Sequence, residues 1–127
     1  MTKRAGFLVF RGISLVLFGS GLSGLGLGKT AYVAFKAVVI KLMKNVAMQF
    51  SSHKIRANII IPSITETPMV QELFSDPQVE KEWRDATPVG RFGRPEEIAK
   101  LSLYLVSDDA GYVTGSEFLI DGGFCAH

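Results

Sequence analysis

Hydrophobic and polar positions divide the chain into short, mostly apolar runs and longer helical patterns. The apolar runs cover residues 13–18, 55–61 and 117–120. A glycine or proline follows each run within two residues, which is typical of buried strands in a parallel sheet. A helical pattern fills residues 30–52 between the first two runs. Two short helices within residues 68–86 and a longer one from Pro95 are expected before the third run.

The helix expected over residues 30–52 is apolar on nearly every side. Its polar positions form one narrow stripe, made of Lys41, Lys44, Asn45 and Gln49. We therefore predict a helix that is buried on most sides, against a sheet and a second helix. The helix from Pro95 begins with Glu96 and Glu97, where the helix dipole favours acidic side chains.

The order strand, helix, strand, helices, strand predicts an α/β fold in which right-handed crossovers build a doubly wound parallel sheet. The 127 residues suffice for one modest domain, so we treat residues 1–127 as a single partial domain. Three strands are too few to make such a domain self-contained, because the sheet keeps an open edge. We therefore expect the chain to be part of a larger assembly or fold.

Composition excludes several classes of protein. Apolar residues make up 47% of the chain and charged residues 20%, which excludes wholesale disorder. Cys125 is the only cysteine, so neither an intrachain disulfide nor a thiolate metal cluster can form. The two histidines, His53 and His127, are too few for a histidine-rich zinc site, and we predict no metal.

The net charge of +2 is unevenly distributed along the chain. Residues 1–65 hold nine Lys or Arg and no Asp or Glu, whereas residues 66–127 hold five against twelve. The basic half could bind nucleic acid or a membrane, or the two halves could attract each other or a partner. The basic residues stand singly among apolar ones rather than in clusters, so we expect no nucleic-acid partner.

The N-terminal region resembles a targeting segment only faintly. An apolar run over residues 5–10 is interrupted by Arg11, and the uncharged stretch 12–28 contains six glycines. A membrane-spanning helix needs about 20 predominantly apolar residues. We therefore expect no export signal, no membrane contact and a cytoplasmic location.

The glycine-rich segment after the first strand has two interpretations. Residues 19–24 match the G-x-G-x-x-G pattern of dinucleotide-binding turns. Further glycines continue to residue 28, however, so no helix begins where a pyrophosphate would need one. The first acidic residue, Glu66, comes too late in the chain to hold a ribose. We favour a plain loop that contains one candidate serine, Ser20, and keep the phosphate loop as the alternative.

Tyr32 and Lys36 stand four residues apart, on one face of the expected helix. A neighbouring cation lowers the pKa of a tyrosine hydroxyl from its ordinary value of about 10. Such a phenol can exchange a proton with an alcohol or a ketone near neutral pH. The alternative is a buried tyrosine with a hydrogen-bonded hydroxyl and a lysine whose ammonium reaches solvent.

Several motifs surround this pair in a fixed order. They are Ser20, Ile-Arg-Ala-Asn at 55–58, Pro-Ser-Ile-Thr-Glu-Thr-Pro-Met at 62–69, Gly-Arg-Phe-Gly-Arg-Pro-Glu-Glu-Ile-Ala at 90–99, Val-Thr-Gly at 113–115 and Asp-Gly-Gly at 121–123. Together they closely resemble the C-terminal half of the short-chain dehydrogenase/reductase family. The resemblance covers about residues 12–123 and implies a partial Rossmann-like domain.

The resemblance implies catalytic roles for Ser20, Tyr32 and Lys36. Tyr32 would exchange a proton with the substrate oxygen, and Ser20 would hold that oxygen. Lys36 would lower the pKa of Tyr32 and bind the nicotinamide ribose. Hydride would pass between NAD or NADP and the substrate, and the sequence does not distinguish the two cofactors. The implied cofactor-binding positions are Tyr32, Lys36, Pro62, Thr65 and Thr67.

The resemblance also implies a substrate class and a partner. Met69, Phe74 and Trp83 fall in the segment that covers the substrate in the family, so we expect an apolar secondary alcohol or ketone. The helix over residues 30–52 corresponds to a dimer-interface helix of the family. We therefore expect a homo-oligomer, or pairing with a family member, through this helix.

The chain departs from the family pattern at several positions. Phe35 replaces the small residue before the lysine, and Ser63 replaces the glycine after the proline. The nucleotide-binding half that precedes the matched region in the family has no counterpart in this sequence. Three hypotheses follow: an oxidoreductase that needs that half from elsewhere, a catalytically inactive fragment, and a non-enzymatic dimerisation module.

Overall fold

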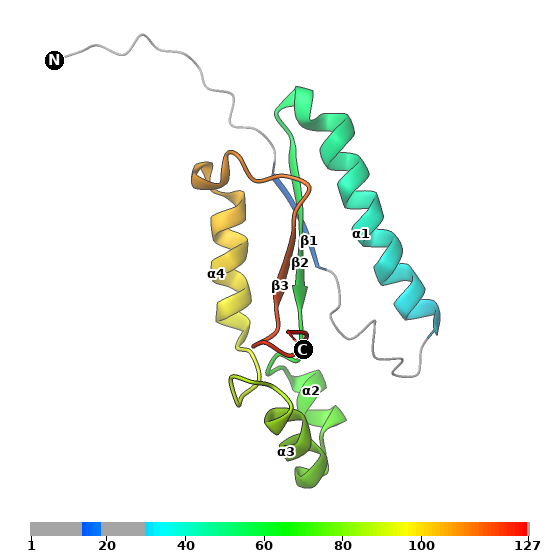
Figure 1. Cartoon of the computed structure of the whole chain (residues 1–127), viewed down its shortest axis with the longest axis vertical. Helices are drawn as coiled ribbons and strands as arrows, with labels where there is room; N and C mark the ends of the chain where they lie inside the picture. The colour runs from blue at the N-terminus through cyan, green and yellow to red at the C-terminus, as the bar shows by residue number, and fades with distance from the viewer. Residues whose placement is uncertain (1–13, 19–29, 127) are drawn as a thin grey trace, which may run out of the picture.

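Three strands of this chain form one parallel sheet in the order β1–β2–β3 (Figure 1). The computed structural model describes residues 14–18 and 30–126. The strands are β1 (Ser14–Phe18), β2 (Arg56–Pro62) and β3 (Glu117–Ile120). The helices are α1 (Thr30–Phe50), η2 (Ser51–His53), α2 (Pro68–Leu73), α3 (Pro77–Asp85), α4 (Pro95–Val106) and η3 (Asp108–Ala110). The α/β fold expected from the sequence is confirmed, with element bounds that differ by one or two residues.

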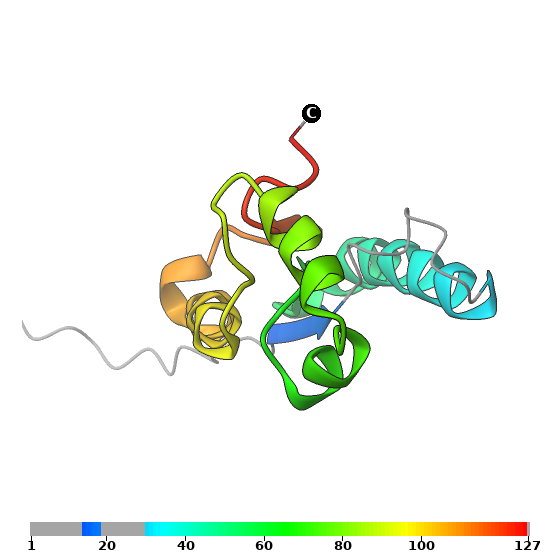
Figure 2. The same ribbon diagram turned by 90° about the horizontal axis from the view of Figure 1, so that it is seen from below.

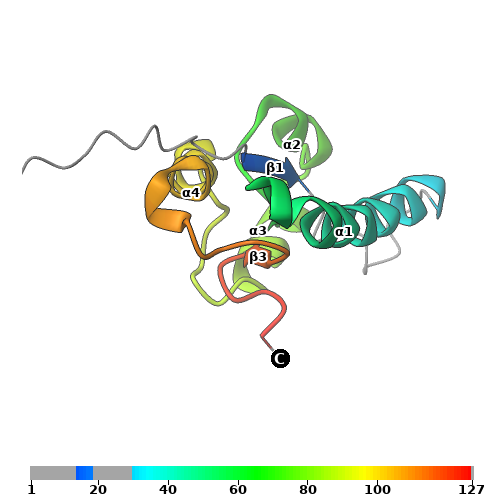
Figure 3. The same ribbon diagram turned by 90° about the horizontal axis from the view of Figure 1, so that it is seen from above.

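Helices cover both faces of the sheet. Viewed along the strands, α1 lies on one side of the sheet and α4 on the other (Figure 3). Alternate residues of β2 point to opposite faces. Ala57, Ile59 and Ile61 form a buried cluster with residues of α1, so Asn58 and Ile60 point towards the α4 side. The sheet is therefore doubly wound, as expected.

The two crossovers have opposite hands, which corrects one expectation. Both connections step in the same direction across the sheet, from β1 to β2 and from β2 to β3. If both of these crossovers were right-handed, their helices would lie on the same face of the sheet. The helices lie on opposite faces, so the two crossovers have opposite hands. The β1–α1–β2 crossover follows the right-handed rule, and the connection from β2 to β3 does not. That second connection carries α2, α3 and α4, so it is much longer than the single-helix crossover to which the rule applies.

The described part of α1 buries one face only. Val39, Met43 and Ala47 repeat every four residues and are 4–7% exposed, packed on β2. On its other sides Val38 is 63% exposed and Leu42 is 55% exposed. The prediction that this helix is buried on most sides is therefore wrong for the single chain. Periodicity identifies the apolar positions of a helix, but it does not show on which of them another element of the same chain packs.

The helix α4 closes the opposite face of the sheet. Leu105 is fully buried there, and its backbone carbonyl accepts a hydrogen bond of 3.0 Å from the Ser14 hydroxyl of β1. The helix begins at Pro95, and the Glu97 carboxylate accepts a hydrogen bond of 2.8 Å from the Arg94 backbone N–H. This contact satisfies one of the donors that precede a helix N-terminus.

Candidate active site

The carboxyl ends of the three strands, at the lower end of Figure 1, gather the elements that could bind a ligand. The helices α2 and α3 lie beyond this edge of the sheet, as Figure 2 shows from below. The N-terminal end of α1 lies towards the same edge, because the helix runs antiparallel to the strands. Open parallel sheets bind ligands at this edge.

Two of the three predicted catalytic residues lie on α1. Tyr32 and Lys36 are in its first two turns, four residues apart, which places them on one helix face. Ser20 lies outside the described residues. The backbone of α1 thus places both residues at the end of the helix that lies towards the carboxyl ends of the strands.

The predicted cofactor-binding residues Pro62, Thr65 and Thr67 lie on one segment, which leaves the carboxyl end of β2 and enters α2. Pro62 is the last residue of β2 and pairs with Ile120 of β3. The Thr65 hydroxyl donates to the Ser63 carbonyl at 3.2 Å. The Thr67 hydroxyl caps α2 and accepts from the Val70 N–H at 3.4 Å. The two hydroxyls therefore have local structural roles in addition to any ligand contact.

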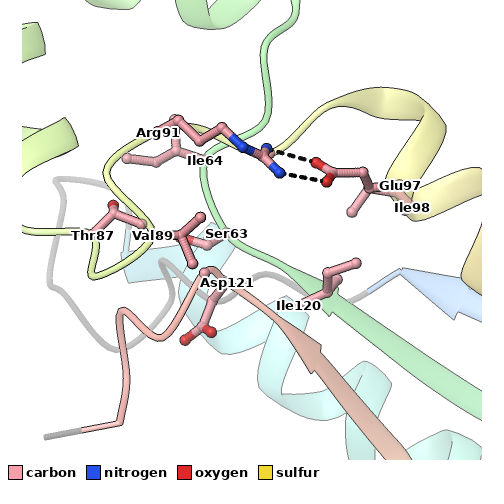
Figure 4. A pocket seen from close by; sticks show the side chains of 11 residues that line it. Ser63, Ile64, Thr87, Val89, Arg91, Glu97, Ile98, Ile120 and Asp121 are labelled. Atoms are coloured by element: carbon pink, nitrogen blue, oxygen red, sulfur yellow. Dashed lines mark hydrogen bonds and ion pairs between the residues drawn. The ribbon is translucent and has the colours of Figure 1, made fainter.

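A pocket of about 200 Å³ lies beside this segment, between the carboxyl ends of β2 and β3 and the start of α4 (Figure 4). Arg91 and Glu97 form an ion pair along its wall. Their hydrogen bonds raise the pKa of Arg91 above its usual value. The Arg91 side chain and then the Arg94 backbone N–H lower the pKa of Glu97 to about 2. Arg91 therefore links the segment before α4 to the first turn of that helix.

The Asp121 carboxylate organises the turn that closes the same pocket. Its Oδ1 accepts from the Gly123 N–H at 2.9 Å, and its Oδ2 accepts from the Cys125 N–H at 2.8 Å. Burial opposes ionisation of this carboxyl group, but the two backbone N–H groups outweigh it and hold the pKa of Asp121 below its usual value. Burial and then Asp121 raise the pKa of the exposed Cys125 thiol. The Asp121 carboxylate therefore has a structural role in this turn.

An open apolar groove of about 550 Å³ lies on the other side of the segment, against α4. Pro62 and Thr65 border it, and Ile98, Leu103 and Val106 of α4 form much of its wall. Thr65 is also joined to Gly93 by an isolated parallel β-bridge. The predicted cofactor segment is thus fixed at both ends and flanked by an apolar surface.

Two of the aromatic residues expected near a substrate lie in one ring cluster. Phe74 and Trp83 have ring centroids 5.9 Å apart, and Trp83 stacks on Phe124 at 5.8 Å with an interplanar angle of 13°. Phe92 packs on Phe74 at 5.5 Å. Sequence reasoning missed Phe92 and Phe124, because no local pattern links rings so far apart in the chain. The side chain of Met69 lies outside the described residues.

Residues 14–18 and 30–126 contain no group of three His, Cys, Asp or Glu side chains placed to hold a metal ion. None of the helices described is long and apolar enough to cross a membrane.

Comparison with protein families identifies relatives over nearly the whole chain. The family model described as enoyl-(acyl carrier protein) reductase matches residues 1–125. The inactive 2-(S)-hydroxypropyl-CoM dehydrogenase 2 of Xanthobacter autotrophicus is 38% identical over 96% of this chain and 55% of its own length. The 3-oxoacyl-[acyl-carrier-protein] reductase of Thermotoga maritima is 43% identical over 76% of this chain and 38% of its own length. The chain therefore spans about half the length, or less, of the curated relatives it matches.

Solved structures give the same result. The ligand-free aldohexose dehydrogenase of Thermoplasma acidophilum is 30% identical, with a TM-score of 0.83 over 92% of this chain and 49% of that one. A short-chain dehydrogenase family protein of Francisella tularensis is 27% identical, with a TM-score of 0.81 over 92% of this chain and 52% of that one. The sequence motifs, the doubly wound sheet and these matches agree, and the chain belongs to the short-chain dehydrogenase/reductase family of oxidoreductases.

Proposed function

We propose that this chain carries the catalytic residues of an NAD(P)-dependent oxidoreductase that acts on an apolar secondary alcohol or ketone. The observation that carries the proposal is the shared location of two segments. Tyr32 and Lys36 stand one turn apart at the end of α1 that lies towards the carboxyl ends of the strands. The segment from Pro62 to Thr67 begins at that same edge.

The three catalytic residues have different roles at the substrate oxygen. In the reductive direction the Tyr32 hydroxyl donates its proton to the substrate carbonyl oxygen, and in the oxidative direction the phenolate accepts it. The Lys36 ammonium lowers the pKa of Tyr32, so that this transfer occurs near neutral pH. The Ser20 hydroxyl donates a hydrogen bond to the substrate oxygen. A bound nicotinamide supplies or accepts the hydride.

The described residues fit the nicotinamide end of the cofactor. A carboxamide needs hydrogen-bond donors and acceptors, and the segment after β2 offers backbone groups together with the hydroxyls of Thr65 and Thr67. Lys36 offers a cation for the adjoining ribose. We propose that the phosphates and the adenosine are held by residues beyond those described, from a further segment or from a partner subunit.

An apolar substrate is supported by the surroundings of this segment. Phe74 and Trp83 lie on the helical connection that follows it, and the groove bordered by Pro62 and Thr65 is almost wholly apolar. The names of two similar proteins describe a reductase and a dehydrogenase, which supports the reaction type. Neither NAD nor NADP is favoured by the described residues.

Calorimetric titration of the purified chain with NADH and with NADPH tests the proposal. Micromolar binding of either nucleotide supports it, and absence of binding at millimolar concentration contradicts it for the chain alone. Turnover of apolar ketones should be lost in Tyr32→Phe, whereas nucleotide binding should weaken only modestly, because Lys36 and the segment after β2 remain. Tyr112→Phe is the matched control, because Tyr112 is fully exposed. Activity that survives in Tyr32→Phe would eliminate the tyrosine mechanism.

The alternative is a non-enzymatic dimerisation module, and one observation favours it. The exposed apolar residues Val38 and Leu42 lie one turn apart on α1, where a second copy or a family member could cover them. Sedimentation velocity of wild type and of Leu42→Glu tests this association. We expect the wild-type oligomer to dissociate in the variant, and an unchanged sedimentation coefficient would rule out this face of α1.

A further inference from the structure

The connection from β2 to α4 extends away from the sheet, and its two ends lie side by side. Thr65 and Gly93 pair at its two ends in a parallel β-bridge. The Glu66 N–H donates to the Gly93 carbonyl at 2.8 Å, and the Gly93 N–H donates to the Ile64 carbonyl at 2.9 Å. Residues 66–92, which we call the flap, therefore form an excursion with a fixed base, and they carry α2 and α3.

The helices of the flap have little core of their own. No residue of α3 is buried. The Arg84 guanidinium lies over the ring of the buried Phe92, 4.2 Å from its centroid. The other polar side-chain pairs along α3 are exposed or half-exposed, such as the ion pair of Arg84 with Glu80 at 2.7 Å. Exposed ion pairs of this kind contribute little to stability. The position of α3 therefore depends on contacts other than the ion pairs on its own surface.

The return limb of the flap is attached more firmly. The Val89 N–H donates to the Gly122 carbonyl at 3.2 Å, and Phe92 is 3% exposed. The Thr87 side chain is also buried, and its hydroxyl donates to the Trp83 carbonyl at 3.0 Å. Any movement of the flap is therefore concentrated in α2 and α3, before residue 87.

Ring contacts join α3 to the body of the domain. Trp83 stacks on Phe124, which lies beyond the carboxyl end of β3 and outside the flap. The turn formed by Asp121 fixes the position of Phe124, because the Phe124 N–H donates to the Asp121 carbonyl at 3.2 Å. Within the flap, Phe74 packs on Trp83 and on Phe92. These ring contacts join the end of α2 to α3.

We propose that the stack of Trp83 on Phe124 is a latch that holds α2 and α3 against the C-terminal turn, and that the flap opens when this stack separates. Offset and stacked aromatic pairs stabilise a contact beyond the area they bury. A segment with few buried apolar contacts opens locally at low cost once such a contact is lost. That the closed flap covers a substrate rests on the proposed function, whereas the latch itself is a property of this chain.

Hydrogen exchange of the purified chain tests the latch without any assay of activity. In Phe124→Leu, which keeps an apolar side chain but removes the ring, we expect the amides of α3 to exchange about fivefold faster, with β2 unchanged. Trp83 is the only tryptophan of the chain, so acrylamide quenching of its fluorescence should also become more efficient. Phe50→Leu is the matched control, because Phe50 contacts His53 at the far end of α1.

Two outcomes would overturn the latch. Unchanged exchange of α3 in Phe124→Leu would show that the stack does not hold the flap. An equal acceleration in α3 and β2 would show that Phe124 stabilises the whole domain instead. Trp83→Leu breaks the same stack from the flap side and should reproduce the local acceleration. Failure to bind a nucleotide would contradict the proposed function but leave these exchange results unaffected.

Discussion

The guanidinium of Arg91 holds both carboxylate oxygens of Glu97, with Nη1 2.9 Å from Oε2 and Nη2 2.7 Å from Oε1. This two-point contact fixes the return limb of the flap to the first turn of α4. Oε2 also accepts from the backbone N–H of Arg94, so one carboxylate both starts the helix and anchors the limb. The pair also borders the pocket between the carboxyl ends of β2 and β3 (Figure 4).

This pair should make stability depend on pH in the acidic range. The pKa of Glu97 is lowered from 4.5 to about 2, so the folded state favours the ionised carboxylate. The stabilisation is complete above pH 4.5 and is lost as the pH falls from 4.5 towards 2. We expect Glu97→Gln to lower the melting temperature at pH 7 and to flatten its fall below pH 5, measured by circular dichroism.

The control for this experiment is the neighbouring Glu96→Gln, because the Glu96 side chain is exposed and lies on the same helical turn. Its acid profile should follow the wild type. If Glu97→Gln and Glu96→Gln give the same profile, the two-point contact does not persist in solution. Added salt should weaken the Arg91–Glu97 contribution, because both side chains are partly exposed.

Asn58 is a buried polar residue in the centre of β2, and its side chain holds the loop before β3. It is fully buried, its Nδ2 donates to the Val113 carbonyl at 2.9 Å, and its Oδ1 accepts from the Ser116 N–H at 3.2 Å. Asn58→Ala leaves the Ser116 N–H without this partner, whereas the Val113 carbonyl keeps a hydrogen bond of 3.3 Å from Arg56 Nη1. We expect a loss of roughly 1–3 kcal/mol in the free energy of unfolding, measured by urea titration.

Asn45→Ala is the matched substitution for Asn58→Ala. Asn45 is exposed on α1, where alanine has the higher helix propensity, so its unfolding free energy should be unchanged or slightly raised. A small loss in Asn58→Ala would mean that water replaces the amide in the loop. Similar values for the two variants would therefore contradict the structural role of Asn58.

The sequence predicts the elements well because their signals are local. The apolar run of β2 contains Ile59 and Ile60, which are fully buried, and Asp76 and Pro77 mark the start of α3 as a cap and a first-turn proline. The spacing of Tyr32 and Lys36 likewise needs only the regular turn of a helix. These features depend on neighbours within four residues, and the structure agrees with them.

Long-range relationships could not be predicted in the same way. The bridge between Thr65 and Gly93 and the stack of Trp83 on Phe124 join residues that no local periodicity connects. The hand of the β2–β3 crossover depends on which face α4 covers, and an apolar stripe on a helix does not specify a face of the sheet. For the same reason the apolar pattern of α1 did not separate residues that pack on β2 from the exposed Leu42.

The two sides of α4 should respond differently to the same substitution. Leu105 is fully buried, whereas Leu103 is 67% exposed beside the apolar groove. We expect Leu105→Ala to reduce the free energy of unfolding by about 2–5 kcal/mol, because it removes buried methyl groups and leaves a cavity. Leu103→Ala should change it by about 0.5 kcal/mol or less. Urea titration of both variants measures the difference, and equal losses would mean that the groove is covered in solution.

Gly122 and Gly90 separate the cost of backbone strain from the cost of a steric clash. Both have positive φ, +63° and +75°, where an L-residue costs roughly 1–2 kcal/mol. A Cβ at Gly122 would lie 2.8 Å from Cγ2 of Thr87, whereas a Cβ at Gly90 would meet no atom within 4 Å. Gly90→Ala should therefore show the strain alone in urea titration, and Gly122→Ala should cost roughly 1–3 kcal/mol more. Equal losses would mean that Thr87 moves aside freely, which its burial and its hydrogen bond to the Trp83 carbonyl oppose.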